Sequence, residues 1–161
     1  MYDINDNPFN QYNLTTSAQN KDELHRSRFH NKRDIKIFNL LAKDIELEKF
    51  KYKSIQSLKT LYEKHVGKSS KVHKYFVLKW NEPSNLIPAH LYKDGLRHIH
   101  PDSEQSRSIS MREAARLQNF PDKYKFEGPQ TEIFKMIGNA VSPLMAEKIA
   151  NAVKMTLYET I

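Results

Sequence analysis

Apolar residues recur at helical spacing in four separate stretches of this 161-residue chain, and each stretch predicts one helix. The first helix is expected to begin at Asp34, because aspartate is a residue type that caps helix N-termini. Its apolar stripe consists of Ile35, Phe38, Leu40 or Leu41, and Ile45.

Two short helices are expected in the last third of the chain. Ser110 and Glu113 form a capping box, so the first of these helices begins after Ser110 and ends before Pro121. The second runs from Thr131 to Ile137 and stops at Gly138, since glycine is common just beyond helix ends.

The last predicted helix begins at Ser142-Pro143, with serine as the N-cap and proline at the first helical position. The side chains on one of its faces are apolar: Met145, Ile149, Ala152, Val153 and Leu157. This face must pack on something, yet two short helices and one amphipathic helix are too little to enclose a core. We infer that a partner surface is missing.

Short strands are expected between the first helix and the last three. Tyr75 to Leu78 predicts one strand, and Asn85 to Leu91 predicts another that enters a turn at Asp94-Gly95. Residues 1–20 are rich in Asn, Gln, Ser and Thr without a sustained period, which predicts a flexible or fragmentary lead. Taken together, the pattern predicts an α+β fold.

The charge is concentrated in the first two thirds of the chain. The formal net charge is +7, and nine lysines lie between Lys49 and Lys79, opposed only by Glu63. Aromatic residues are interleaved with these lysines, an arrangement that suits contact with a phosphate backbone. A solvated loop or helix face explains this segment equally well. The candidate DNA-binding lysines are Lys59, Lys64, Lys68 and Lys71.

The chain contains no cysteine, which excludes disulfides, thiolate metal sites and a cysteine nucleophile within it. No apolar run is long enough for a membrane span, and no secretory signal follows Met1, so we expect a reducing cytoplasm. His98 and His100 have the spacing of two ligands on one strand face, but no further residue completes a tetrahedral set nearby. We therefore expect no metal site.

Two motifs in register resemble the DNA cytosine-5 methyltransferases of bacteria and phages. Residues 107–122, RSISMREAARLQNFPD, resemble motif IX of that family, and residues 137–143, IGNAVSP, resemble motif X. The segment from Trp80 to Pro101 is similar to the one that closes the target-recognition domain, and His25-x-x-Arg28 is similar to its opening. The resemblance covers most of residues 25–155.

The resemblance also implies what is missing. Enzymes of this family flip a cytosine out of the duplex, attack it with a cysteine thiolate and transfer a methyl group from S-adenosylmethionine. The Pro-Cys, Glu-Asn-Val and Arg-x-Arg motifs of that chemistry do not occur here, and neither does the glycine-rich cofactor loop. No catalytic residue is therefore assigned, and the isolated chain is expected to be inactive.

The resemblance assigns roles to a few residues of this chain. Asn139, Ala140 and Val141 would line the S-adenosylmethionine pocket, and Arg107 would contact the DNA backbone. It further implies that Arg116, Gln118 and the other polar residues of motif IX organise the structure, whereas Glu113 completes the capping box. Two positions depart from the family pattern: Leu86-Ile87, where threonine usually precedes an aliphatic residue, and Ser142, where proline or an aliphatic residue is usual.

The implied organisation has three parts. Residues 1–24 form the lead, 25–105 the target-recognition region, and 106–161 the helices that complete a Rossmann-like methyltransferase domain. The partners would be double-stranded DNA and a catalytic-domain polypeptide carrying the Pro-Cys motif, with no membrane involved. The methylation would serve restriction–modification, phage protection or regulation, and the sequence does not distinguish among these roles. The alternative is a non-catalytic DNA-binding module derived from such an enzyme.

Overall fold

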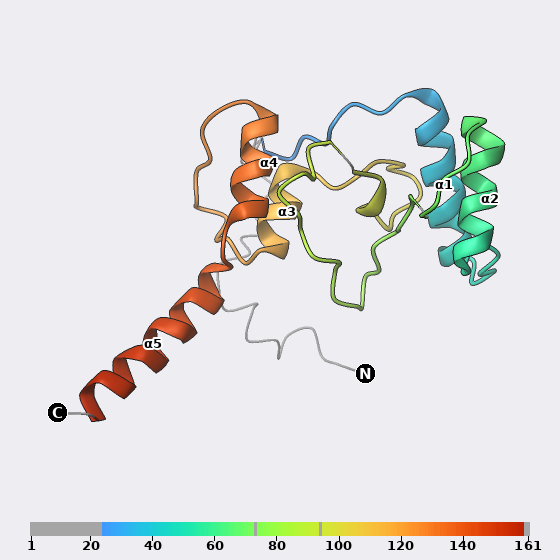
Figure 1. Cartoon of the computed structure of the whole chain (residues 1–161). Coiled ribbons are helices and arrows are strands. Elements are labelled where there is room, and N and C mark those ends of the chain that lie inside the picture. Colours follow the sequence, from blue (N-terminus) through green and yellow to red (C-terminus); the bar gives the residue numbers. More distant parts are fainter. Residues whose placement is uncertain (1–23, 73, 94, 160–161) are drawn as a thin grey trace. The chain divides into compact units, whose positions relative to one another are not determined.

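The described residues of the chain are mostly helical. The computed structural model describes residues 24–72, 74–93 and 95–159 (Figure 1). Its helices are α1 (Lys32–Glu46), α2 (Ile55–Val66), the short 3-10 helix η3 (Gly95–Arg97), α3 (Met111–Leu117), α4 (Gln130–Asn139) and α5 (Pro143–Glu159). Residues 1–23 of the predicted lead lie outside the described residues.

The chain divides into two compact units, and a short segment that interrupts the second unit along the sequence belongs to the first. Among the described residues, the first unit comprises 24–26, Ile87–Leu91 and 111–159. The second comprises Ser27–Leu86 and Tyr92–Ser110, without residues 73 and 94. Ile87–Leu91 thus belongs with α3, α4 and α5, although its neighbours on both sides belong to the second unit.

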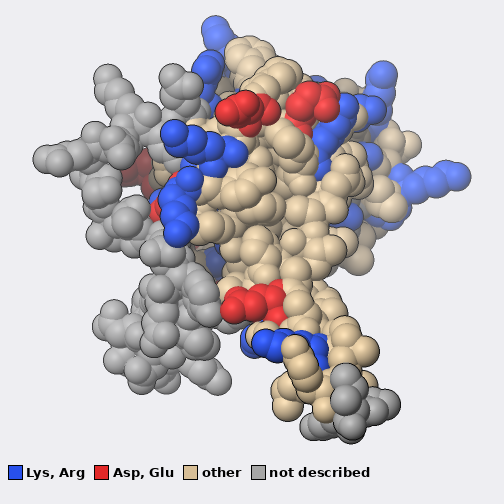
Figure 2. All heavy atoms as spheres, turned by 90° about the vertical axis from the view of Figure 1, so that its left-hand side faces the viewer, with Lys and Arg blue, Asp and Glu red and all other residues tan. Residues whose placement is uncertain are grey.

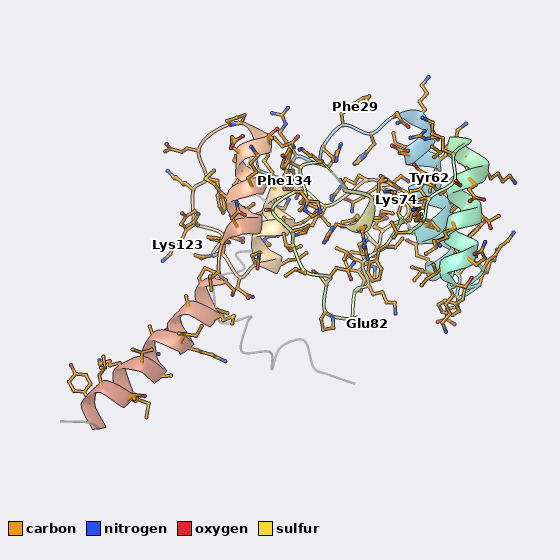
Figure 3. All side chains as sticks on the ribbon, in the orientation of Figure 1. Phe29, Tyr62, Lys74, Glu82, Lys123 and Phe134 are labelled. Carbon is orange, nitrogen blue, oxygen red and sulfur yellow. The ribbon has the colours of Figure 1, made fainter. Side chains whose placement is uncertain are left out.

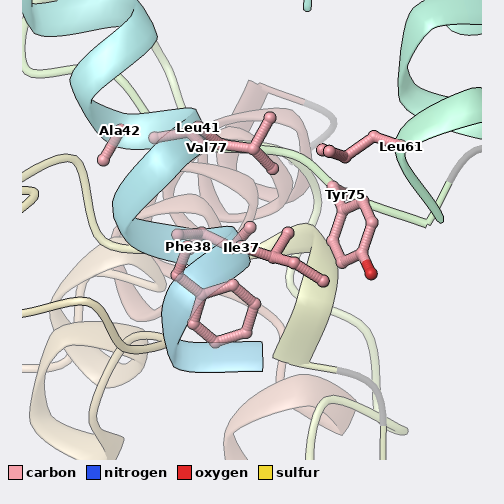
Figure 4. Packing of buried hydrophobic residues seen from close by; sticks show 8 residues of the cluster. Ile37, Phe38, Leu41, Ala42, Leu61, Tyr75 and Val77 are labelled. Carbon is pink, nitrogen blue, oxygen red and sulfur yellow. The ribbon is translucent and has the colours of Figure 1, made fainter. Parts of the chain in front are cut away.

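The core of the second unit lies between α1, α2 and the backbone segments that follow them. Figure 4 shows its buried side chains. They are Ile37, Phe38, Leu41 and Ala42 from α1, Leu61 from α2, and Tyr75, Val77 and Ile99 from the later segments. The predicted α1 stripe is therefore correct at Phe38 and Leu41 but wrong at Ile35, which is 41% exposed. Successive turns bury positions 37, 38, 41 and 42, so the stripe is rotated towards Ile37.

The start of α1 also differs from the prediction. The N-cap is Asn31, whose side-chain oxygen accepts a hydrogen bond from the Asp34 backbone N–H at 2.9 Å. Asp34 lies inside the first turn, where its negative charge is favourable near the positive end of the helix dipole. Both residue types cap helices, and the sequence alone did not separate them.

The predicted strands at 75–78 and 85–91 are not formed. In the described part of the chain, β pairing is limited to two isolated bridges, a parallel one from Ile99 to Val77 and an antiparallel one from Ile99 to Ser108. Short backbone hydrogen bonds surround them, including Leu78 N–H to Ile99 O at 2.9 Å and His100 N–H to Arg107 O at 2.9 Å. Residues 75–78 thus form a single β-bridge, through Val77, and no continuous strand.

The first unit packs α3 against α4, and Ile87–Leu91 crosses α4 at close range. Gly138 lies inside α4 and does not end it, which corrects the predicted stop at this residue. A Cβ atom at Gly138 would collide with the Pro88 carbonyl and lie 2.6 Å from the Ala89 nitrogen. The glycine is needed because another backbone touches the helix there, and not because its φ angle is positive.

Helix α5 begins at Pro143, as predicted, but its apolar face is uncovered. The exposed fractions are 59% for Met145, 49% for Ile149, 53% for Val153 and 63% for Leu157. In Figure 2 the helix is the arm at the lower right, largely uncharged apart from a short band of acidic and basic side chains. In the part of the chain that the structure describes, nothing buries the stripe that the sequence pattern marks.

Candidate functional site

The predicted cofactor residues lie at the corner between α4 and α5. Asn139 is the last residue of α4 and is exposed, Ala140 is half-buried and Val141 is 61% exposed. The helix ends as the Ala140 N–H bonds to the Ile137 carbonyl at 3.3 Å and the backbone at Ala140 becomes extended. The three residues therefore form an accessible bend between two helices.

Two consecutive residues after α3 form hydrogen bonds with this corner. Gln118 Nε2 donates to the Ile137 carbonyl at 3.3 Å, and the Ser142 hydroxyl donates to Asn119 Oδ1 at 2.9 Å. Asn119 has a φ of 60°, the left-handed conformation that asparagine tolerates better than most residues. Serine at position 142, unusual for the resembling family, thus has a partner that fixes the start of α5.

Asn119 positions this corner although the sequence pattern did not predict that role. Its signal is present, because asparagine directly after a predicted helix commonly takes the left-handed conformation at a C-terminus. The contact with Ser142 spans 23 residues and has no counterpart in the local pattern. Only the fold reveals it.

The donors at the corner fit a carboxylate ligand. The N–H groups in the first turn of a helix have no partners within the helix, and the helix dipole favours negative charge there. In α5, Pro143 has no N–H and the first regular bond runs from Ala146 N–H to Ser142 O at 2.9 Å. The N–H groups of Leu144 and Met145 come before this bond and are donors for an anionic group, and the Asn139 side chain is exposed at the end of the preceding helix.

The polar residues of the α3 region make local structural contacts. Arg116 forms a bidentate ion pair with Asp122, at 2.8 Å for each of its two hydrogen bonds. Arg112 is 3% exposed and directs its guanidinium at the Tyr124 carbonyl, at 3.4–3.5 Å. These contacts agree with the structural role that we expected of Arg116 and Gln118.

Arg107 lies in the second unit, in the segment that pairs with Ile99 and its neighbours. Its guanidinium donates to Gln105 Oε1 through Nε at 2.9 Å and also through Nη2, and to the Ser108 carbonyl at 3.1 Å. The side chain is half-buried. These hydrogen bonds therefore fix the orientation of the Arg107 guanidinium.

The four candidate lysines lie on and just after α2. Lys59 is half-buried and Lys64 is exposed on the helix, and Lys68 and Lys71 are exposed in the segment that follows. Because five residues turn a helix by about 140° beyond a full turn, Lys59 and Lys64 do not share a face. The structure thus brings Lys64, Lys68 and Lys71 to exposed positions around the C-terminal end of α2 and leaves Lys59 apart.

The histidine pair has structural partners. His98 Nε2 lies 3.2 Å from the Leu86 carbonyl, and His100 Nδ1 accepts a hydrogen bond from the Asp102 N–H at 3.2 Å. Trp80 meets the His100 ring edge-on, with the ring centroids 5.5 Å apart. Within the described ranges, no three His, Asp or Glu side chains gather as a metal site.

A sequence model of the C-5 cytosine-specific DNA methylases matches residues 1–155. The chain belongs to this family. Its members are related to the type II restriction–modification methyltransferases and use S-adenosylmethionine. The chain itself has no cysteine.

Several relatives match the chain over part of their own length. The type II methyltransferase M.Bpa9945I of Bacillus paralicheniformis is 41% identical over 132 residues, which is 81% of this chain and 29% of that protein. A putative type II methyltransferase, M.OihORF3336P of Oceanobacillus iheyensis, is 47% identical over 51% of this chain and 18% of its own. Mouse DNA (cytosine-5)-methyltransferase 1 is 43% identical over 45% of this chain and 4% of its own.

The chain thus spans less than a third of these relatives. No solved structure matches it. Among the helices that the structure describes, none combines the length and apolarity that crossing a membrane requires.

Proposed function

We propose that the chain is the C-terminal part of a DNA (cytosine-5)-methyltransferase. It supplies target recognition and one wall of the S-adenosylmethionine pocket, while the catalytic cysteine lies on another polypeptide or elsewhere in a longer one. The observation that carries this proposal is the coincidence of a family match over residues 1–155 with the complete absence of cysteine. A thiolate nucleophile is required for attack on cytosine and cannot come from this chain.

The cofactor part of the proposal rests on the corner between α4 and α5. Asn139 and the N–H groups of the first turn of α5 would hold the carboxylate end of S-adenosylmethionine, with Ala140 and Val141 as wall. The bound cofactor supplies the methyl group that is transferred. The contacts of Gln118 and Asn119 with the two helices keep the corner in place before a ligand arrives.

The DNA part of the proposal rests on the second unit. The Gln105 side chain and the Ser108 carbonyl hold the guanidinium of Arg107, and Lys64, Lys68 and Lys71 add exposed positive charge near the end of α2. Contacts of this kind fix a protein on the duplex through its phosphates and carry no base sequence by themselves. In the cell, the chain would serve a cytoplasmic methyltransferase of a bacterial or phage restriction–modification system.

The docking part of the proposal rests on the bare face of α5. Burial of Met145, Ile149, Val153 and Leu157 against the catalytic domain would contribute on the order of 6–10 kcal/mol before association costs. A catalytic domain with a complementary apolar surface would complete the core that this chain begins. The same interaction would place the corner beside the rest of the cofactor pocket.

Complementation tests the proposal at individual residues. The full chain is mixed with a polypeptide that contains the Pro-Cys motif and the glycine-rich loop, and transfer of labelled methyl groups to duplex DNA is measured. Ile149→Asp should abolish complementation because it places a charge on the docking face. Asn139→Ala should leave association intact and raise the S-adenosylmethionine concentration needed for half-maximal transfer.

A matched control is Asn151→Asp, which adds the same side chain and the same charge about 160° around α5 from Ile149 and should complement normally. If Ile149→Asp complements as well as this control, α5 is not the docking face. If the chain binds duplex DNA but complements no catalytic polypeptide, the non-catalytic DNA-binding module is the correct interpretation.

A further inference from the structure

The segment that leads into α1 carries positive charge that the proposed DNA surface does not yet include. Residues 28–33 read Arg-Phe-His-Asn-Lys-Arg and include no acidic residue. We call residues 28–33 the basic strap. It belongs to the second unit and has no regular secondary structure up to Asn31, the extended N-cap of α1.

The strap is fastened to its unit by one inward residue. His30 Nε2 accepts a hydrogen bond from the Ser108 N–H at 3.1 Å and lies 2.9 Å from the Ser108 hydroxyl. The His30 ring also meets Phe38 edge-on, with the centroids 4.9 Å apart. His30 is half-buried as a result, whereas the side chain of its neighbour Phe29 is exposed.

Phe29 is an aromatic side chain with no use inside the described structure. It is 88% exposed, and Figure 3 shows it on the connection that leads into α1. An aromatic ring placed this far into water contributes nothing to the core. It has the chemistry of a ring that packs on a sugar or base of a bound nucleic acid.

Arg28 is held beside the same anchor. A Cβ atom at the buried Gly95 would lie 3.1 Å from Arg28 Cδ and 3.0 Å from the Ser108 side chain, so both side chains lie against the glycine backbone. Within the described ranges, no carboxylate pairs with Arg28 or Lys32. Asp34 is already bonded to Arg33 and Asn31.

The electrostatics at His30 show that two arginine charges converge there. The pKa of His30 is lowered from 6.5, first by burial and then by the positive charge of Arg28, with Arg107 acting in the same direction and Asp34 against it. Arg107 is also the residue next to Ser108, the partner of His30. The strap therefore adjoins Arg107, the residue already proposed to contact the DNA backbone.

We propose that the basic strap is a second DNA-contacting element, in which Arg28 and Lys32 bind phosphates of the duplex and Phe29 packs on the adjoining sugar or base. Arginine at this place adds the bidentate phosphate recognition that the lysine-rich region lacks. The inference rests on the proposed function, because it takes duplex DNA as the ligand. It extends the DNA surface from Arg107 along the entry to α1.

The test measures binding of the full chain to a fluorescent 30-base-pair duplex over a range of salt concentrations. The double variant Arg28→Gln, Lys32→Gln should reduce the slope of log K against log salt by about 1.8, that is, by about 0.9 for each lost phosphate contact. Phe29→Ala should weaken binding about fivefold and leave the slope unchanged. The matched control Lys148→Gln, Lys154→Gln removes the same charge from α5 and should retain the slope of the unmodified chain.

Conservative variants keep the test independent of folding. Arg28→Lys keeps the stem beside Gly95 and the charge, so it should retain the slope, and Lys32→Gln alone should lose about 0.9 of it. Equal slopes of log K against log salt for the strap double variant and the α5 control would contradict the proposal that the basic strap contacts DNA. The proposal would also be contradicted if heparin bound as tightly as the duplex and the strap variant weakened the binding of both to the same extent. Failure of the unmodified chain to bind any duplex would instead overturn the proposed function.

Discussion

Helices α1 and α5 have the same kind of sequence pattern and opposite surroundings. Both are amphipathic, with 15 and 17 residues, yet α1 buries Ile37, Phe38, Leu41 and Ala42, whereas every described side chain of α5 from 145 to 158 is exposed. Periodicity therefore predicts which face of a helix is apolar, but not whether the same chain supplies the surface that covers it. Among the described residues, none supplies the cover for α5 that α2 and the later segments supply for α1.

The comparison predicts that equivalent truncations have unequal costs, and this is the largest effect that we expect. Leu41→Ala should lower the free energy of unfolding by about 2–5 kcal/mol, because it leaves a cavity in the core between α1 and α2. Ile149→Ala should change it by less than about 0.5 kcal/mol, since the side chain is already in water. Urea denaturation of the full chain measures both. Equal costs would show that α5 is buried within the chain.

A smaller effect is expected at the crossing of Ile87–Leu91 over α4. Gly138→Ala should lower the free energy of unfolding by about 1–3 kcal/mol, because its methyl group has no room beside the Pro88 carbonyl. The matched control is Gly67→Ala, where φ is 74° and no atom lies within 4 Å of the new Cβ, so only backbone strain is added. Denaturation should find Gly138→Ala more costly; the reverse order would mean that the crossing is not close.

The smallest effect concerns pH. Since burial and the nearby arginines hold the pKa of folded His30 below 6.5, the unfolded chain binds more protons than the folded one just below pH 6.5. The free energy of unfolding should therefore fall as the pH drops through that window, while the Ser108 N–H loses its acceptor. Comparing the unmodified chain with His30→Asn at pH 7.5 and 5.5 isolates this contribution from the other histidines. An identical pH dependence in both proteins would contradict it.

The sequence predicted the helices that end in clear local signals. The beginning of α3 after Ser110 and of α5 at Pro143 needs only the residues around those positions. Helix α2 was missed because its lysines favoured an interpretation by charge, although Ser54 and Gly67 stand at its two ends as caps. Those two residues are the signal that could have found it.

Other features depend on contacts between distant residues and lie beyond local reasoning. The sequence predicted that Asn139 lies at the corner between α4 and α5. It did not predict the hydrogen bond from Ser142 to Asn119 at this corner, because the two residues are 23 positions apart. The anchor of the basic strap joins His30 to Ser108 across 78 residues. Gly138 was predicted to end a helix, whereas the fold shows that a glycine is required there because the Pro88 backbone passes close to α4.

The most direct test of the account is a chimera with M.Bpa9945I of Bacillus paralicheniformis. The part of that protein that this chain matches, 29% of its length, is replaced by the matching residues of this chain, and transfer of labelled methyl groups from S-adenosylmethionine to duplex DNA is measured. We expect the chimera to transfer methyl groups, the chain alone to give background, and Ile149→Asp to inactivate the chimera. Robust transfer by the chain alone, or a folded chimera that binds S-adenosylmethionine and DNA without transferring methyl groups, would contradict the account.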